Sequence, residues 1–133
     1  MAAAKCLQDK VVIVTGSGRG IGRDIAMLAA AEGAKVVVND LGGSTEGEGR
    51  DTSPADDVVK EIKQAGGIAV ANYDSVAEPE SAQKIIQTAI DNFGRSDGIV
   101  NNAGILRDRI FHRMSVVDFE MVIKVHLMGS FYM

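Results

Sequence analysis

Residues 11–22, VVIVTGSGRGIG, join four consecutive β-branched residues to a loop in which every second residue is glycine. The unbroken apolar run is typical of a strand buried on both faces, as in a parallel sheet. A flexible linker would not need such a strand in front of it. We therefore interpret the glycines as positions where something approaches the backbone so closely that no side chain fits. They are Gly16, Gly18, Gly20 and Gly22.

Apolar spacing predicts an alternation of strands and helices along the rest of the chain. Such alternation is typical of right-handed βαβ crossovers and a parallel sheet, an α/β fold. The glycine-rich, acidic loop Leu41–Thr52 is expected to be a solvated surface excursion, although it starts where a ligand lies in such folds. Further strands are expected at 35–39, at 68–71 and from 99, and later helices at 55–62, 82–93 and 116–133. The first helix carries its apolar spacing on Ile21, Ile25, Leu28 and Ala29, and the third on Ala82, Ile85, Ile86, Ala89, Ile90 and Phe93.

Length and composition exclude several classes of protein. The 133 residues predict one domain, and the formal charge of −4 argues against a nucleic-acid partner, which needs a basic surface. No apolar run approaches the roughly 18–20 residues that span a bilayer, so no membrane partner is expected. The first ten residues hold no apolar core of a secretory signal. We expect an intracellular, cytoplasmic protein, or a peroxisomal one if its source is eukaryotic. The single cysteine, Cys6, cannot form an internal disulfide, and no metal site is predicted.

The glycine loop is the first candidate binding feature. Ligands of open α/β sheets bind at the carboxyl ends of the strands, and this loop follows the first strand. Unpaired amides and the positive end of the helix dipole favour a pyrophosphate there. The spacing is G-x-x-x-G-x-G, which differs from the G-x-G-x-x-G fingerprint, and no G-K-[ST] of a P-loop follows. A plain tight turn between strand and helix is the alternative interpretation.

Asp40 is the second candidate feature. It ends the second predicted strand 24 positions after Gly16, close to the roughly 20 expected for the acid that binds the adenosine ribose. A carboxylate there accepts hydrogen bonds from ribose hydroxyls and repels a 2′-phosphate, which favours NAD over NADP. Arg19 argues the other way, because a cation in the loop would hold that phosphate. Asp40 as a simple turn residue is the alternative.

Two motifs together resemble those of the short-chain dehydrogenase/reductase family. Residues 15–22 fit T-G-x-x-x-G-x-G, residues 101–104 read N-N-A-G, and the resemblance covers essentially all 133 residues. It implies a Rossmann-like, doubly wound parallel sheet with strand order 3-2-1-4, of which this chain holds the N-terminal part. Four stretches are similar to the (3R)-hydroxyacyl-CoA dehydrogenase units of peroxisomal multifunctional β-oxidation enzymes. They are VVVNDLGG (36–43), VANYDSV (70–76), NNAGILRDR (101–109) and VHLMGSF (125–131).

The resemblance also implies roles for individual residues. Asp74 and Ser75 would border the adenine, with the Asp74 carboxylate accepting the exocyclic amine; a turn at a strand end is the alternative. Residues 102–104 would line the ribose side of the cofactor, and Asn101 would tie neighbouring strands together. The full set of candidate cofactor-binding residues is Gly16, Ser17, Gly18, Arg19, Gly20, Ile21, Gly22, Asp40, Asp74, Ser75, Asn101, Asn102, Ala103 and Gly104.

The last predicted helix, 116–133, departs from the general family pattern at one position. Ser115 and Asp118 form a capping box at its start. Most family members carry an asparagine on this helix, whereas this chain has His126, as the hydroxyacyl-CoA subgroup also does. His126 is a weak catalytic candidate, with a hydrogen-bonded core histidine as the alternative. Apolar residues on two faces of the helix imply burial on two sides, and the family's use of this helix in dimers predicts a homo-oligomer.

The family's catalytic residues are not found in this sequence. Hydride transfer in the family uses a serine and a Tyr-x-x-x-Lys pair, but Tyr73 is followed by Ala77 at that spacing and Tyr132 only by Met133. We interpret the chain as the cofactor-binding half of an NAD-dependent oxidoreductase that interconverts a secondary alcohol, such as a 3-hydroxyacyl thioester, and its ketone. The alternatives are a nucleotide-binding module without catalysis and an NADP-dependent 3-oxoacyl carrier-protein reductase.

Overall fold

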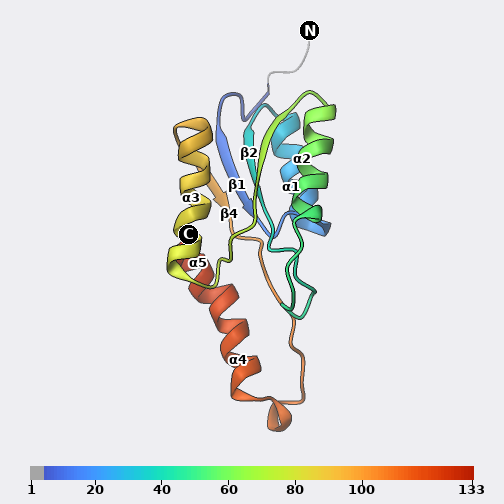
Figure 1. Cartoon of the computed structure of the whole chain (residues 1–133), viewed down its shortest axis with the longest axis vertical. Coiled ribbons are helices and arrows are strands. Elements are labelled where there is room, and N and C mark those ends of the chain that lie inside the picture. The colour runs from blue at the N-terminus through green and yellow to red at the C-terminus, as the bar shows by residue number, and fades with distance from the viewer. Residues whose placement is uncertain (1–4) are drawn as a thin grey trace.

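The computed structural model describes residues 5–133 and contains one parallel sheet. The strands lie in the order β3-β2-β1-β4, which confirms the predicted order 3-2-1-4 (Figure 1). Residues 1–4, which form part of the segment used for the targeting prediction, lie outside the described residues. The strand bounds are β1 Val11–Thr15, β2 Lys35–Asn39, β3 Ile68–Asn72 and β4 Gly98–Val100.

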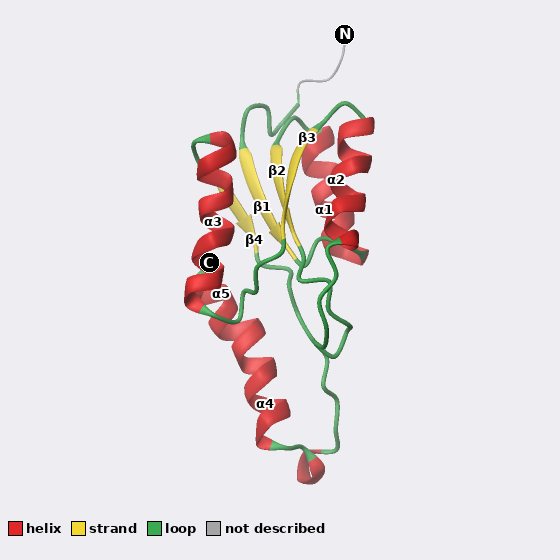
Figure 2. Cartoon of the chain, in the orientation of Figure 1, coloured by secondary structure: helices red, strands yellow, loops and turns green. Residues whose placement is uncertain are grey.

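Helices cover both faces of the sheet, as in a doubly wound fold (Figure 2). Helices α1 (Gly20–Ala31) and α2 (Ser53–Gln64) lie on one face, and α3 (Pro79–Phe93) lies on the other. Alternate residues of one strand enter opposite cores: Val12 and Val14 pack with α1 and α2, whereas Val11 and Ile13 pack with α3. The prediction that the first strand is buried on both faces is therefore confirmed.

Helix α1 faces the sheet differently from the prediction. Ile21 and Leu28 are 75% and 64% exposed, so two of the four expected core positions are wrong. The residues that do face the sheet are small, because the helix backbone lies close to the strands at its first turn. These buried residues are Gly22, Ala26, Ala29 and Ala30.

The last part of the chain is a helix interrupted by one π segment. After the short 3₁₀ helix η1 (Phe111–Arg113), α4 (Val116–Ile123), the π segment η2 (Lys124–Met128) and α5 (Gly129–Tyr132) follow without a break. One half of the predicted capping box is confirmed, since the Asp118 amide donates to Ser115 Oγ at 3.0 Å, whereas the Asp118 carboxylate accepts the Ser115 hydroxyl in place of its amide. Helix α4 projects beyond the sheet, while α5 returns to α3 (Figure 1). Within residues 5–133, no helix has the length and apolar character needed to cross a membrane.

Two isoleucines on α3 provide a matched test of this packing. Ile85 is completely buried, whereas Ile90, from the same predicted apolar stripe, is 40% exposed. We expect Ile85→Ala to lower the free energy of unfolding by about 2–5 kcal/mol through a cavity in the core. The same change at Ile90 should cost less than about 1 kcal/mol. Urea unfolding followed by circular dichroism measures both, and equal losses would contradict the described orientation of α3.

Candidate functional site

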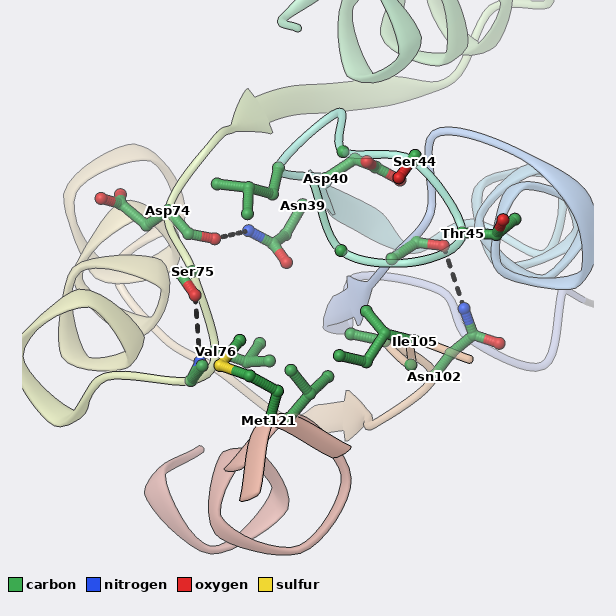
Figure 3. Close-up of a pocket in the computed structure, with 18 of the residues that line it drawn as sticks. Asn39, Asp40, Ser44, Thr45, Asp74, Ser75, Val76, Asn102, Ile105 and Met121 are labelled. Atoms are coloured by element: carbon green, nitrogen blue, oxygen red, sulfur yellow. Dashed lines mark hydrogen bonds between the residues drawn. The ribbon is translucent and has the colours of Figure 1, made fainter. Parts of the chain in front are cut away.

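A cavity of about 310 Å³ lies at the carboxyl ends of the strands. Residues from the turn after β1, the end of β2, the segment after β3 and the segment after β4 surround it (Figure 3). This is where ligands bind in open α/β sheets. Eight of the predicted cofactor-binding residues line the cavity: Gly16, Arg19, Asp40, Asp74, Ser75, Asn102, Ala103 and Gly104.

The other six predicted residues do not line it. Ser17 is buried, and its hydroxyl donates to the main-chain oxygen of Val14 at 2.7 Å. Ile21 and Asn101 are exposed. The remaining three are glycines of the loop, Gly18, Gly20 and Gly22.

Three of the loop glycines are required by contacts within the chain itself. A Cβ at Gly16 would lie 2.8 Å from the Cα of Ala103, and one at Gly22 would lie 2.3 Å from the Gly16 oxygen. A Cβ at Gly18 would collide with Pro54 at 2.6 Å. The groups that approach these glycines closely, as the sequence predicts, are therefore atoms of the protein itself.

Gly20 differs from the other loop glycines. Its φ of +54° disfavours a side chain, yet nothing lies within 4 Å of the position a Cβ would take. Gly20 is also the first residue of α1, whose first amides have no acceptor within the helix. The helix N-terminus at this residue is therefore open to an anionic group.

The Asp40 carboxylate connects the glycine loop to the loop that follows β2. One oxygen accepts the Gly18 amide and the other accepts the Gly42 amide, each at 2.7 Å. Asp40 therefore stabilises a turn, as one interpretation predicts, and also lines the cavity, as the other requires. Arg19 lines the same cavity but is exposed.

A pair of buried asparagines places Asp74. The side-chain amide of Asn39 donates to the Asn72 side chain at 2.8 Å and to the main-chain oxygen of Asp74 at 2.9 Å (the latter dashed in Figure 3). Asn72 in turn donates to the Asp74 carboxylate at 2.9 Å. The sequence patterns did not point to either asparagine, although each is a polar residue that ends a buried strand.

The roles predicted for the two adjacent asparagines after β4 are partly wrong. Asn102 ties the strands together, because its side chain donates to the main-chain oxygens of Thr15 and Gly16, each at 3.0 Å. Asn101, which was expected to do this, is exposed. Successive residues of an extended chain point in opposite directions, so only one of the two can face β1.

The loop after β2 is largely exposed, as its composition predicts, and it also contacts the segment after β4 through main-chain oxygens. The Leu106 amide donates to the Thr45 oxygen at 2.8 Å, and Nε of Arg107 donates to the Glu46 oxygen at 2.9 Å. The loop thereby forms one wall of the cavity. Lining residues that the sequence patterns did not reveal are Leu41, Gly43, Ser44, Thr45, Gly47, Val76, Ala77, Ile105, Met121 and Val125, together with Asn39.

His126 holds the segment after β4 and does not line the cavity. Its Nε2 lies 3.1 Å from the Ile105 nitrogen and 2.9 Å from the Ile105 oxygen, so either ring tautomer has a partner. A Cβ at Gly104 would lie 2.7 Å from the ring. The core interpretation of His126 is wrong, since the residue is exposed.

Tyr73 is directed away from the cavity. Its hydroxyl donates to the Asp56 carboxylate on α2, and this hydrogen bond raises the pKa of Tyr73 to about 12. The phenol is therefore protonated at neutral pH and engaged elsewhere. In the described part of the chain, no three His, Cys, Asp or Glu side chains gather as a metal site would require.

The family model for short chain dehydrogenases matches residues 10–133. The chain therefore belongs to the short-chain dehydrogenase family, and the resemblance seen in the two glycine-containing motifs is confirmed.

Individual relatives agree with this assignment. The chain is 55% identical over 126 residues to a short-chain type dehydrogenase/reductase of Mycobacterium tuberculosis, which is 95% of this chain and 44% of that protein. It is 53% identical over 131 residues to the peroxisomal multifunctional enzyme type 2 of Mus musculus, covering 98% of this chain and 17% of the enzyme. The crystal structure of a short chain dehydrogenase from Mycobacterium avium superimposes with a TM-score of 0.87 at 50% identity, over 95% of this chain and 44% of that one. The chain thus spans less than half of these proteins.

Substitution of two glycines by alanine tests the packing around the site. We expect Gly22→Ala to lower the free energy of unfolding by about 1–3 kcal/mol, because its methyl group would overlap the Gly16 oxygen. Gly98→Ala is the control, since nothing lies within 4 Å of its Cβ position. Thermal or urea unfolding distinguishes them. An unchanged stability of Gly22→Ala would show that α1 does not approach the turn as described.

Proposed function

We propose that the chain forms the dinucleotide-binding part of an NAD-dependent oxidoreductase that interconverts a secondary alcohol and a ketone. The observation that carries this proposal is the convergence of Gly16, Asp40, Asp74 and the segment 102–104 on one cavity at the strand ends. Membership of the short-chain dehydrogenase family supports it.

The residues around the cavity fit a nicotinamide dinucleotide. The volume of about 310 Å³ is at the lower end of the roughly 300–1,000 Å³ typical of ligand sites. The open N-terminus of α1 at Gly20 suits the pyrophosphate, Asp40 suits the adenosine ribose, and Asp74 suits the adenine amine. When bound, the nicotinamide ring accepts or supplies the hydride.

Asp40 favours NAD over NADP. Its carboxylate is fixed at the end of β2 by two amides and lies at the cavity wall, so a 2′-phosphate placed there would be repelled. Arg19 also lines the cavity and supports the second candidate, an NADP-dependent 3-oxoacyl carrier-protein reductase. We favour NAD because Asp40 is held in place, whereas Arg19 is exposed.

We infer a 3-hydroxyacyl-CoA type substrate. The support is the resemblance of four stretches to the hydroxyacyl-CoA dehydrogenase units of multifunctional enzymes, together with 53% identity to the peroxisomal multifunctional enzyme of mouse. We propose a cytoplasmic or a peroxisomal location, and the mouse relative supports the peroxisomal alternative.

Catalysis needs residues that these 133 do not provide. The sequence has no Tyr-x-x-x-Lys, and Tyr73 is bound to Asp56 away from the cavity. We therefore propose that residues 1–133 are an incomplete NAD-binding domain. Exposed apolar side chains along the last part of the chain, such as Phe111, Val117 and Phe131, agree with further contacts, including those of a homo-oligomer.

A longer reading of the coding sequence distinguishes the enzyme from a binding module. A downstream serine and Tyr-x-x-x-Lys, with NAD-dependent oxidation of a 3-hydroxyacyl thioester by the longer protein, would support the enzyme. A stop codon after Met133, with binding but no turnover, would support the module.

Cofactor preference gives the direct test of the site. We expect calorimetry to show tighter binding of NADH than of NADPH. Asp40→Asn should weaken NADH binding by roughly 10- to 100-fold and reduce the preference for NADH over NADPH, since a hydrogen bond to a charged group is worth roughly 1.5–3 kcal/mol.

Asp91→Asn on α3 removes the same charge far along the chain and serves as the control. Tighter binding of NADPH by the unchanged protein would overturn the role of Asp40. Absence of heat with either dinucleotide would overturn the proposed function.

A further inference from the structure

The loop between β2 and α2 lines the cavity and is held in shape by hydrogen bonds between its own residues. The Asp51 amide donates to the Leu41 oxygen at 3.2 Å, which brings the two ends of the loop together. At the other end, the Ser44 amide donates to the Glu48 oxygen at 2.7 Å. The loop therefore has a defined tip, residues 44–48.

The tip contacts the segment that follows β4. Main-chain oxygens of Thr45 and Glu46 accept hydrogen bonds from the Leu106 amide and from Nε of Arg107. A Cβ at Gly47 would lie 3.0 Å from Ile105. Because tip residues and Ile105 both line the cavity (Figure 3), their contact joins two parts of its wall.

Arg107 extends this contact to the start of α4. Its Nη1 lies 3.2 Å from a carboxylate oxygen of Asp118, and the two side chains are only 16% and 22% exposed. Asp118 also accepts a hydrogen bond from the Ser115 hydroxyl at 2.8 Å. The hydrogen bond from the Ser115 hydroxyl, and to a smaller extent the Arg107 guanidinium, holds the pKa of the Asp118 carboxyl below its ordinary value. The guanidinium thus binds the loop with one edge and an ionised helix cap with the other.

We propose that Arg107 is a positioning residue that holds the tip of the β2–α2 loop over the cavity and so slows the release of a bound dinucleotide. The inference rests on the proposed function. A ligand held by Asp40 would lie beside the loop, so the contact between the tip and residues 105–107 would restrain its departure. Lysine would replace Arg107 poorly, because its compact ammonium group lacks the planar spread of donors with which the guanidinium reaches both partners.

Release kinetics in the complete chain test this role. NADH bound to the protein is displaced by excess NAD, and the loss of its fluorescence is followed by stopped flow. We expect Arg107→Met to release NADH about tenfold faster, as expected for the loss of a charge-assisted hydrogen bond. Arg107→Lys should release it faster than the unchanged protein as well. Arg109→Met is the matched control, because Nη1 of Arg109 donates to the main chain of its neighbour Asp108, and its release rate should not change.

Hydrogen exchange of the Leu106 amide, measured without any dinucleotide, reports the tip contact by itself. Exchange should be faster in Arg107→Met, and Arg107→Lys provides the same comparison if the methionine variant does not fold. Unchanged exchange would overturn the inference, and so would faster exchange with an unchanged release rate, since Arg107 would then only support the fold. If the unchanged protein binds neither NADH nor NADPH while exchange responds as expected, the proposed function fails and this inference fails with it.

Discussion

The rest of the site depends on the close packing of the turn after β1 against the segment after β4. This packing leaves no space for a side chain at Gly16 or Gly22. Gly22 meets the Gly16 oxygen, Gly16 meets Ala103, and the Asn102 side chain binds the main chain of both Thr15 and Gly16. These contacts fix the start of α1 relative to β4. The open helix N-terminus at Gly20 is thereby directed to one place above the sheet.

Buried polar side chains at the strand ends extend this order across the sheet. Asn39 and Asn72 are the last paired residues of β2 and β3, and their side chains bind each other as well as Asp74. A buried amide that lacked one of these partners would cost roughly 1–3 kcal/mol. The polar groups that face the cavity are therefore held by hydrogen bonds in the absence of a ligand.

Sequence patterns predicted the parts of the molecule that depend on local periodicity. The valine runs indicated β1 and β2, and the order of elements together with the family resemblance indicated the sheet. Patterns failed where tertiary contacts decide. Apolar spacing placed Ile21 and Leu28 in the core, but close approach of the α1 backbone selects alanine and glycine instead. The exposed loop after β2 was predicted, but not its contacts with the segment after β4, because they use main-chain oxygens, which composition does not reveal.

The π segment of residues 124–128 has a consequence for how this region can tolerate length changes. A π turn holds one residue more than an α turn, whereas each residue added to a regular α-helix rotates the rest of that helix by about 100°. In the observed register Gly129 packs against Val76, where a Cβ would lie 3.0 Å from the valine side chain. The π segment therefore takes up one residue without that rotation. Straightening it into an α-helix of the same length would turn Gly129 away from Val76 and a bulkier side chain into its place, so the irregular turn acts as an angular spacer.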